Sequence, residues 1–456
     1  MRTWLPLFAV CLGAFLLITD TTVVTVALPE LAVGLRASLA EQQWVQGAYP
    51  LILAVLALSA GSLGDRFGQL RVFRCSVALF GLASLGCALA PTIGLLIAAR
   101  CAQAVGGAAL FTTAMSLLAA SYTGRARGTA FGVFTAVLGV AGALGPILGG
   151  LLTQALTWRA IFVINVPLAA ITLTLTATIH ATTPTKPARI DLPGTLTFGI
   201  AAGALSYALI AAKPALFPVA AVALAAFVAI ERRSTAPMLD LRLLASRSVA
   251  GILFGVLTSA AVFAQLIYAS LWLQSTVRLG PIPAGLALMP MAAALFVAST
   301  LIGKRLSTLP ARLTLPIGAL LAAIGSALNW LLAVDAITLL PGLVLTGIGM
   351  GIAGPATSTA LLAAAPPDRA GMASGAMATV RQLGQTLGVA VLGIGYPAGI
   401  GVVFLLTSAF ALLGAITMWI GTTYTRITFV HIRLPRKTAN ARQPTTNKRP
   451  RWTEPR

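Results

Sequence analysis

Apolar residues occur along this chain in long runs that are separated by short polar segments. The runs recur from Leu5 to the region of Thr422, and each contains about 17 or more residues, enough to cross a hydrocarbon core of ~30 Å as a helix. They are too long for the strands of a membrane barrel, whose spans need only about ten residues each. The pattern therefore predicts an all-α integral membrane protein.

Fourteen runs are predicted to be transmembrane helices. The first is not interpreted as a signal peptide, because it is long, contains Asp20 and lacks a small-residue cleavage site. The expected bounds are 5–28, 44–64, 72–92, 94–120, 129–153, 160–180, 193–212, 214–230, 248–274, 282–302, 312–333, 338–362, 371–395 and 399–424.

Composition and charge support this prediction and give it an orientation. Hydrophobic residues make up 58% of the chain and charged residues 9%, whereas a soluble domain carries about 25% charged residues. With a cytoplasmic amino terminus, 25 of the 31 Lys and Arg residues fall on the cytoplasmic side and four fall outside. The positive-inside rule therefore places both termini in the cytoplasm and the chain, multi-pass, in the cell inner membrane.

The basic segment 425–456 is rich in Pro and Thr and has no apolar period, so it is predicted to be a disordered cytoplasmic tail. Anionic lipid headgroups explain its charge without a nucleic-acid partner. The four Cys and two His residues show no metal-ligand spacing, and the chain has no catalytic or nucleotide-binding motif. We expect no cofactor, no metal and no enzymatic activity.

Asp20 is the only acidic residue well inside a predicted span. A carboxylate at that depth costs roughly 2.5–3.5 kcal/mol on insertion scales, so a functional role is the first hypothesis. Arg100, in the fourth span, is expected within about 3 Å of the same depth. The two side chains can pair when Asp20 is ionised and separate when it is protonated, which would couple a proton to a conformational change. Two alternatives are a permanent pair that only fixes helix packing, and an Arg100 that bonds backbone carbonyls while Asp20 alone exchanges the proton.

Small residues form two further patterns. The loop after the second span reads GSLGDRFGQLR from Gly61 to Arg71, and the fifth span contains GVAGALGPILGG from Gly139 to Gly150. Small residues allow close helix approach, and a proline bends its helix. We expect these residues to gate the conformational change: Gly61, Gly64, Asp65, Arg66, Gly68, Arg71, Gly142, Gly145, Pro146 and Gly149.

The loop from Gly61 to Arg71 resembles the signature loop of the major facilitator superfamily. The segments DTTVVTVALP in the first span, RCAQAVGGA in the fourth and FVINVP in the sixth are similar to those of the fourteen-span drug:proton antiporters of the EmrB/QacA type. Asp65 is then expected to face the amino end of the thirteenth span. The resemblance implies a major facilitator fold with a six-helix bundle at 1–180, a linker with an extra central hairpin at 181–247 and a second six-helix bundle at 248–424.

A polar substrate cavity is expected between the two bundles. Its candidate lining residues are Gln103, Gln265, Tyr268 and Arg381. For Arg381, near the middle of the thirteenth span, three interpretations stay open: it lines the cavity, neutralises a substrate anion, or bonds helix carbonyls.

The function expected from these features is proton-coupled export of drugs or other small amphipathic compounds by a monomer that alternates access. Neutral or monocationic substrates are favoured, because the second half has no acid inside a span. One alternative is a dedicated exporter of a single metabolite or self-made antibiotic. A non-transporting membrane receptor is a weaker alternative, because the chain has no signalling domain.

Overall fold

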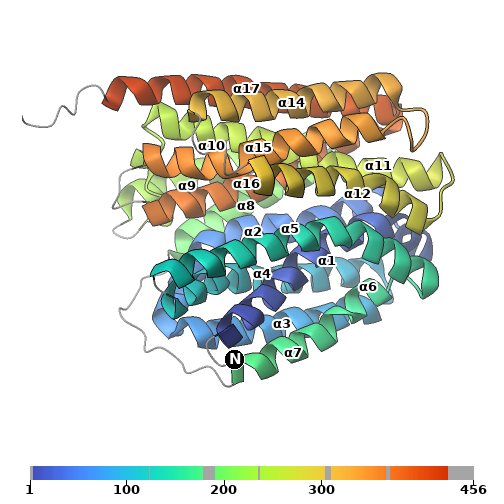
Figure 1. The fold of residues 1–456 in the computed structure, drawn as a ribbon, viewed down its shortest axis with the longest axis horizontal. Coiled ribbons are helices and arrows are strands. Elements are labelled where there is room, and N and C mark those ends of the chain that lie inside the picture. The colour runs from blue at the N-terminus through green and yellow to red at the C-terminus, as the bar shows by residue number, and fades with distance from the viewer. Residues whose placement is uncertain are drawn as a thin grey trace, which may run out of the picture.

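The computed structural model describes residues 4–122, 124–177, 191–234, 237–302, 310–365 and 370–429. Regular secondary structure within these ranges is helical throughout, which confirms the predicted all-α class (Figure 1). Residues 178–190 of the predicted linker and 430–456 of the predicted tail lie outside the described ranges.

The first bundle, in blue to green, occupies the lower half of Figure 1. The turns between its helices are short: α1 ends at Arg36 with φ +52°, and Gly68, with φ +92°, separates α2 from α3. A break at Ile164 divides the sixth predicted span into two helices. The helices are α1 (Leu5–Leu35), α2 (Leu39–Phe67), α3 (Gln69–Leu89), α4 (Ile93–Ser121), α5 (Gly124–Ala155), α6 (Ala160–Val163) and α7 (Asn165–Ala177).

The second bundle lies above the first in Figure 1, and a helical hairpin precedes it in the chain. The hairpin consists of α8 (Leu192–Ile210) and α9 (Phe217–Arg233), and α8 contacts both α2 and α16. The second bundle contains α10 (Arg247–Ala260), the 3-10 turn η4 (Ala261–Ala264), α11 (Gln265–Ser275), α12 (Pro281–Val297), a π-helical turn (Ala298–Ile302), α14 (Ala311–Leu332), α15 (Leu340–Ala364), α16 (Ala370–Gly395) and α17 (Ile400–Phe429).

Twelve helical segments in the described part of the chain are long and apolar enough to cross a membrane, not the fourteen expected. The two expected spans missing from this set, 44–64 and 371–395, coincide with α2 and α16. The middle of α16 carries Arg381, Gln382 and Gln385, and the first half of α2 contains Gln42, Gln43 and Gln46. The count of fourteen spans is therefore not supported.

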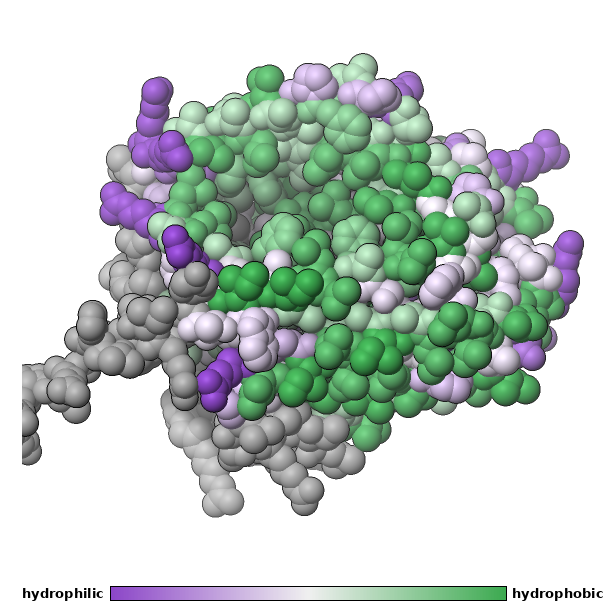
Figure 2. Space-filling model, turned by 90° about the horizontal axis from the view of Figure 1, so that it is seen from above, coloured by the Kyte–Doolittle hydropathy of each residue, from purple (hydrophilic) through white to green (hydrophobic). Residues whose placement is uncertain are grey.

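Large apolar side chains cover much of the face shown in Figure 2, and others are exposed on helices of both halves of the chain. Leu82 on α3 is 69% exposed, Leu196 on α8 65% and Ile416 on α17 50%. Soluble monomers rarely expose such continuous apolar surface. Together with the twelve apolar segments, this surface identifies a multi-pass membrane protein.

A buried apolar cluster joins the two bundles at one end of the molecule. We call the end where α1 begins the Leu5 side and the end where it terminates the Leu35 side. One buried apolar cluster joins the bundles at the Leu35 side, through Leu28 and Trp158 of the first bundle and Leu288 and Phe404 of the second. Two further clusters lie toward the Leu5 side, and each belongs to a single bundle. The described core is therefore closed between the bundles at the Leu35 side.

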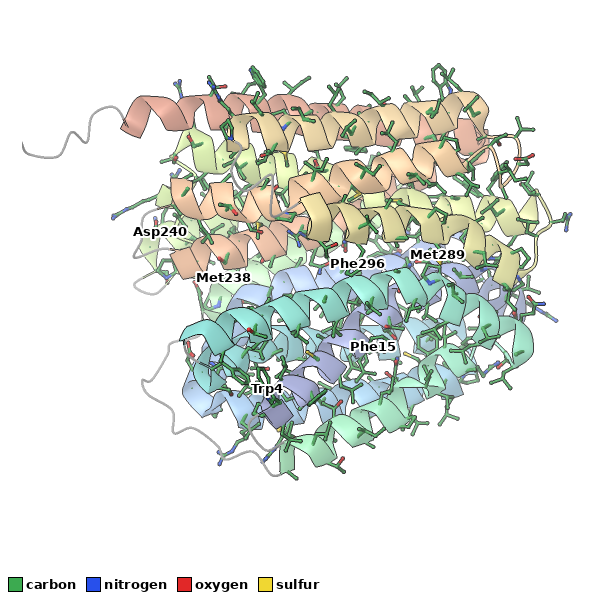
Figure 3. The ribbon with its side chains drawn as sticks, in the orientation of Figure 1. Trp4, Phe15, Met238, Asp240, Met289 and Phe296 are labelled. Atoms are coloured by element: carbon green, nitrogen blue, oxygen red, sulfur yellow. The ribbon has the colours of Figure 1, made fainter. Side chains whose placement is uncertain are left out.

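Three glutamine side chains bridge the bundles at the same closed end. Gln274 Nε2 donates to the Val26 carbonyl at 2.9 Å, and Gln43 Nε2 donates to Tyr268 Oη at 3.2 Å. The Ile282 N–H donates to Gln154 Oε1 at 3.3 Å. Further toward the Leu5 side, Phe296 on α12 lies at the boundary between the bundles and packs against Gly139 of α5 (Figure 3).

Candidate functional site

Asp20 and Arg100 form an ion pair in the interior of the first bundle. Arg100 Nη1, on α4, donates to Asp20 Oδ2, on α1, and the side chains of both residues are fully buried. This is the only ion pair among the described residues. The two side chains are therefore close together in the structure, as expected. They lie at a similar depth although α1 and α4 run in opposite directions.

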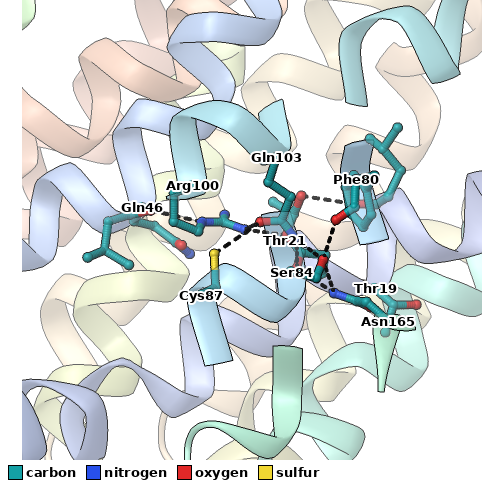
Figure 4. A network of polar contacts seen from close by, with 12 residues as sticks. Thr19, Thr21, Gln46, Phe80, Ser84, Cys87, Arg100, Gln103 and Asn165 are labelled. Carbon is teal, nitrogen blue, oxygen red and sulfur yellow. Dashed lines mark hydrogen bonds and ion pairs between the residues drawn. The ribbon is translucent and has the colours of Figure 1, made fainter. Parts of the chain in front are cut away.

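Two amides complete the coordination of the carboxylate (Figure 4). Gln103 Nε2 donates to Asp20 Oδ1 at 2.8 Å, and Asn165 Nδ2, on α7, donates to the same oxygen at 2.9 Å. Gln103 Nε2 also reaches Ser84 Oγ, on α3, at 2.7 Å. Because an ionised carboxylate only accepts hydrogen bonds, three donors around Asp20 fit its ionised form.

Arg100 is held from several directions. Its Nη1 donates to Gln103 Oε1 at 2.6 Å, and its Nε donates to the Val45 carbonyl at 3.4 Å. Its guanidinium carbon lies 4.5 Å from the centre of the Tyr49 ring, which is cation–π geometry. The other terminal nitrogen, Nη2, is buried and has no hydrogen-bond partner in the structure. The guanidinium thus keeps one free donor while neutralising Asp20.

This arrangement suits a group that exchanges a proton. Protonating Asp20 removes the negative charge, so the buried Arg100 loses its counter-ion and the network has to rearrange. Breaking a buried pair typically costs 3–5 kcal/mol, which is enough to bias a two-state conformational equilibrium strongly. The members of the site come from α1, α3, α4 and α7, so a change in the network would be felt by four helices of the first bundle.

The four candidate cavity residues do not form one cavity in the structure. Gln103 belongs to the Asp20 network and is fully buried. Gln265 is also fully buried and accepts from Ser326 Oγ at 3.2 Å inside the second bundle. Tyr268 is buried at the closed end, where it donates to the Val389 carbonyl. Only Arg381 is half-buried.

The signature loop lies at the Leu5 side, where it joins α2 to α3. Gln69 Nε2 donates to Asp65 Oδ1 at 2.8 Å, and Arg66 lies 5.4 Å from the ring of Phe67. Residues 366–369, directly before α16, lie outside the described ranges, so the expected contact between Asp65 and the start of this helix is not described. Gly61, Gly64 and Arg71 lie within the two helices, and Gly68 is the turn between them.

The α5 glycines lie at two close helix contacts. A Cβ atom at Gly149 would lie 2.8 Å from the Val23 carbonyl oxygen on α1, and one at Gly145 would overlap the Thr22 side chain. On an adjacent face of α5, the Pro146 carbonyl packs against Gly285 of α12. By contrast, the nearest atom to a Cβ at Gly142 is Ile18 Cγ2 at 3.8 Å. Thus α5 packs between α1 of its own bundle and α12 of the other.

We expect Gly149→Ala to lower stability by about 1–3 kcal/mol, because the new methyl group meets backbone that cannot move without shifting α1. Gly142→Ala, on the same helix, has room and serves as the matched control. Thermal unfolding of both purified variants in detergent provides the measurement. Equal midpoints would show that the close α1–α5 contact does not constrain packing.

Sequence analysis missed Asn165, Ser84 and Tyr49 as members of the site. Asn165 lies in the FVINVP segment, and a buried amide in an apolar span is itself a signal of a polar partner. Ser84 carries no such signal, because a Ser side chain commonly bonds its own helix, as Ser84 Oγ does to the Phe80 carbonyl at 2.7 Å. Tyr49 carries no such signal either.

Known proteins resemble this chain along most of its length. It is 35% identical over 404 residues to the multidrug resistance protein Stp of Mycobacterium tuberculosis (strain CDC 1551 / Oshkosh), covering 85% of this chain and 75% of that protein. It is 32% identical to the methylenomycin A resistance protein of Streptomyces coelicolor, covering 90% of each chain. A puromycin resistance protein of Streptomyces alboniger is 36% identical and covers 86% of this chain and 81% of its own length.

Solved structures share the fold. A mutant of the peptide transporter POT in complex with alafosfalin superposes with a TM-score of 0.71 at 15% identity, covering 92% of this chain and 95% of that one. A bacterial homolog of the human lysosomal transporter Spinster, in an inward-facing and unoccupied conformation, gives 0.67 at 18% identity, covering 95% and 99%. The Major Facilitator Superfamily model matches residues 10–389. The chain is a membrane transporter and not an enzyme, and it belongs to the Major Facilitator Superfamily.

Proposed function

We propose that this transporter is a proton-coupled antiporter that exports small amphipathic compounds by alternating access. The single observation that carries the proposal is the buried network around Asp20, the only acid well inside a span. Inward movement of one proton across 100 mV is worth about 2.3 kcal/mol, enough for roughly fifty-fold accumulation of a neutral compound. Relatives named for multidrug, methylenomycin A and puromycin resistance support export as the direction.

The proposed topology is the fourteen-helix arrangement of the EmrB/QacA type, acting as a monomer in the cell inner membrane. In it, α2 and α16 also cross the bilayer, where they contact each other across the two bundles. The domains are bundles at 1–180 and 248–424, an extra hairpin within 181–247 and a cytoplasmic tail at 425–456. Three helices at the Leu5 side carry an arginine at or near their first residue: Arg71, Arg247 and Arg312. This supports a cytoplasmic position for that side and for both termini.

The closed Leu35 side then corresponds to an inward-facing state. An exporter releases its proton to the cytoplasm in this state, and the three donors around Asp20 fit the carboxylate that remains after release. A new external proton would bind Asp20 only after the Leu35 side has opened, and its binding would break the network and favour the return to the inward-facing state. In this scheme the signature-loop residues and the α5 glycines and proline act as gates and packing surfaces.

The charge of the substrate follows from where the acids lie. The second bundle has no acid inside a span, and Asp20 is already neutralised by Arg100. The monocationic compounds that the sequence favoured would therefore lack a counter-ion in this state. Of the neutral and monocationic substrates predicted from the sequence, we favour compounds without a fixed positive charge.

Everted membrane vesicles test the proposal. The interior of such vesicles corresponds to the cell exterior, so an imposed acidic interior should drive accumulation of amphipathic fluorescent dyes, and nigericin should abolish it. Accumulation that is indifferent to the gradient would exclude proton coupling. A resistance screen of cells carrying the gene distinguishes breadth: many protected compounds indicate multidrug export, and a single one indicates the dedicated exporter.

A further inference from the structure

Arg381 is a charged side chain near the middle of α16. Eleven residues precede it in the helix and fourteen follow, which places it about 16 Å from one end and about 21 Å from the other. A cation at this depth is costly and is a candidate for function by default. Its side chain is half-buried, whereas Arg100 in the first bundle is fully buried.

The contacts of neighbouring residues show which way Arg381 faces. Gly384 and Gly388 pack against Leu257 and Ala261, so one face of α16 lies on the span formed by α10 and α11. About 160° around the helix from Gly388, Thr386 donates to the Gly47 carbonyl of α2 at 3.4 Å. At 100° per residue, Arg381 lies about 20° around the helix from Gly388 and about 140° from Thr386. It is therefore at the edge of the face that contacts α10. It therefore faces the space between α2 of the first bundle and α10 of the second.

The exposure of the side chains changes along one strip of α16, which contains Leu392, Gln385, Arg381 and Ala378. Leu392, near the Leu35 side, is fully buried in the apolar cluster that joins the bundles. Gln385, Arg381 and Ala378, which follow toward the Leu5 side, are all half-buried. The strip therefore runs from the closed end toward the Leu5 side, with Arg381 and Gln385 as its polar groups.

No described acidic side chain neutralises Arg381. Among the described residues the only ion pair is that of Asp20 with Arg100, and Arg381 makes no hydrogen bond or ring contact. In particular, the helix-carbonyl bonds considered from the sequence are not formed. Asp20 and Arg100 neutralise each other and are inaccessible, so Arg381 is the only charged side chain near the middle of a described helix that is neither paired nor fully buried.

We propose that Arg381 binds an acidic group of the exported compound, such as a carboxylate, sulfonate or phenolate, with Gln385 beside it as a further hydrogen-bond donor. A guanidinium offers paired donors to such an anion, and the low dielectric at this depth strengthens the interaction. This inference rests on the proposed export function and narrows its substrates to amphipathic compounds that carry an ionisable acid. The apolar surroundings accommodate the rest of the molecule.

Two matched probes test the proposal on the purified protein in lipid nanodiscs. Anilinonaphthalene sulfonate and phenylnaphthylamine share one aromatic scaffold, and only the first carries a negative charge. Fluorescence titration without any proton gradient gives the affinity of each probe after subtraction of empty nanodiscs. We expect Arg381→Gln to weaken sulfonate binding by about 10- to 100-fold and to leave the neutral probe unchanged. Arg381→Lys should retain most of the preference for the anion.

Arg312→Gln is the control, because Arg312 is an exposed arginine at the Leu5 side, and this variant should bind both probes as the wild type does. Equal loss of both probes in Arg381→Gln would indicate a structural role and overturn the proposal, as would an unchanged sulfonate affinity or no saturable binding by the wild type. Vesicle transport separates the two proposals. Arg381-dependent binding without gradient-driven uptake would leave the anion site standing and reject the exporter, and proton-driven uptake without anion preference would do the reverse.

Discussion

Replacing Asp20 with Asn should abolish gradient-driven dye accumulation in everted vesicles. Asn has nearly the shape of Asp but cannot release a proton, so the carrier can no longer couple the pH gradient to export. Exchange of labelled for unlabelled dye at equal pH needs no net proton movement and should survive. We expect accumulation to fall to the level of vesicles that lack the protein, a loss of up to about fifty-fold at 100 mV.

The control for this prediction is Asp335→Asn. Asp335 lies in the exposed turn between α14 and α15, where its carboxylate accepts from the backbone N–H groups of Ile337 and Thr338 at 2.9 Å. Removing this charge should leave accumulation unchanged. Wild-type accumulation in Asp20→Asn would move proton coupling to another group, and loss of exchange together with accumulation would indicate a folding defect instead.

Replacing Arg100 with Leu should cause the largest loss of stability. The substitution removes the counter-ion of a fully buried carboxylate together with its bonds to Gln103 and the Val45 carbonyl. Breaking a buried pair in this way typically costs about 3–5 kcal/mol. Thermal unfolding of the purified variant in detergent, followed by circular dichroism, should show a clear drop of the midpoint.

The double variant Asp20→Asn with Arg100→Leu sharpens this test. With both charges absent, no uncompensated carboxylate remains, so the double variant should be more stable than Arg100→Leu alone. This non-additivity is the signature of a direct pair. If the two losses simply add, the buried pair does not contribute to stability as the structure indicates.

Part of this site followed from sequence alone. Asp20 is conspicuous because an acid inside an apolar run has a large desolvation cost, and the depth of Arg100 follows from counting residues along two helices. The overall class followed for the same reason, since a bilayer requires long apolar helices. The α5 glycines also indicated close packing, and Gly149 lies against the α1 backbone.

Other features depend on tertiary structure. Gln103, Gln265 and Tyr268 looked like cavity residues, but a polar side chain in a span can equally bond a neighbouring helix, as each of these three does. Asn165 reaches Asp20 from α7, and no sequence spacing predicts a contact between residues so far apart. The count of fourteen spans is not supported by length and composition, which leave out α2 and α16, and these two helices contact each other across the bundles.

The central claim is that Asp20 exchanges a proton with the transport cycle, and proton release on substrate binding measures it most directly. A dye that the protein transports is added to purified protein in weakly buffered solution with a pH indicator, at a series of pH values. Substrate selects the inward-facing state with its ionised carboxylate, so the wild type should release protons, up to about one per molecule, and Asp20→Asn none. Equal release by both proteins, or none by the wild type at any pH between 5 and 9, would contradict the account.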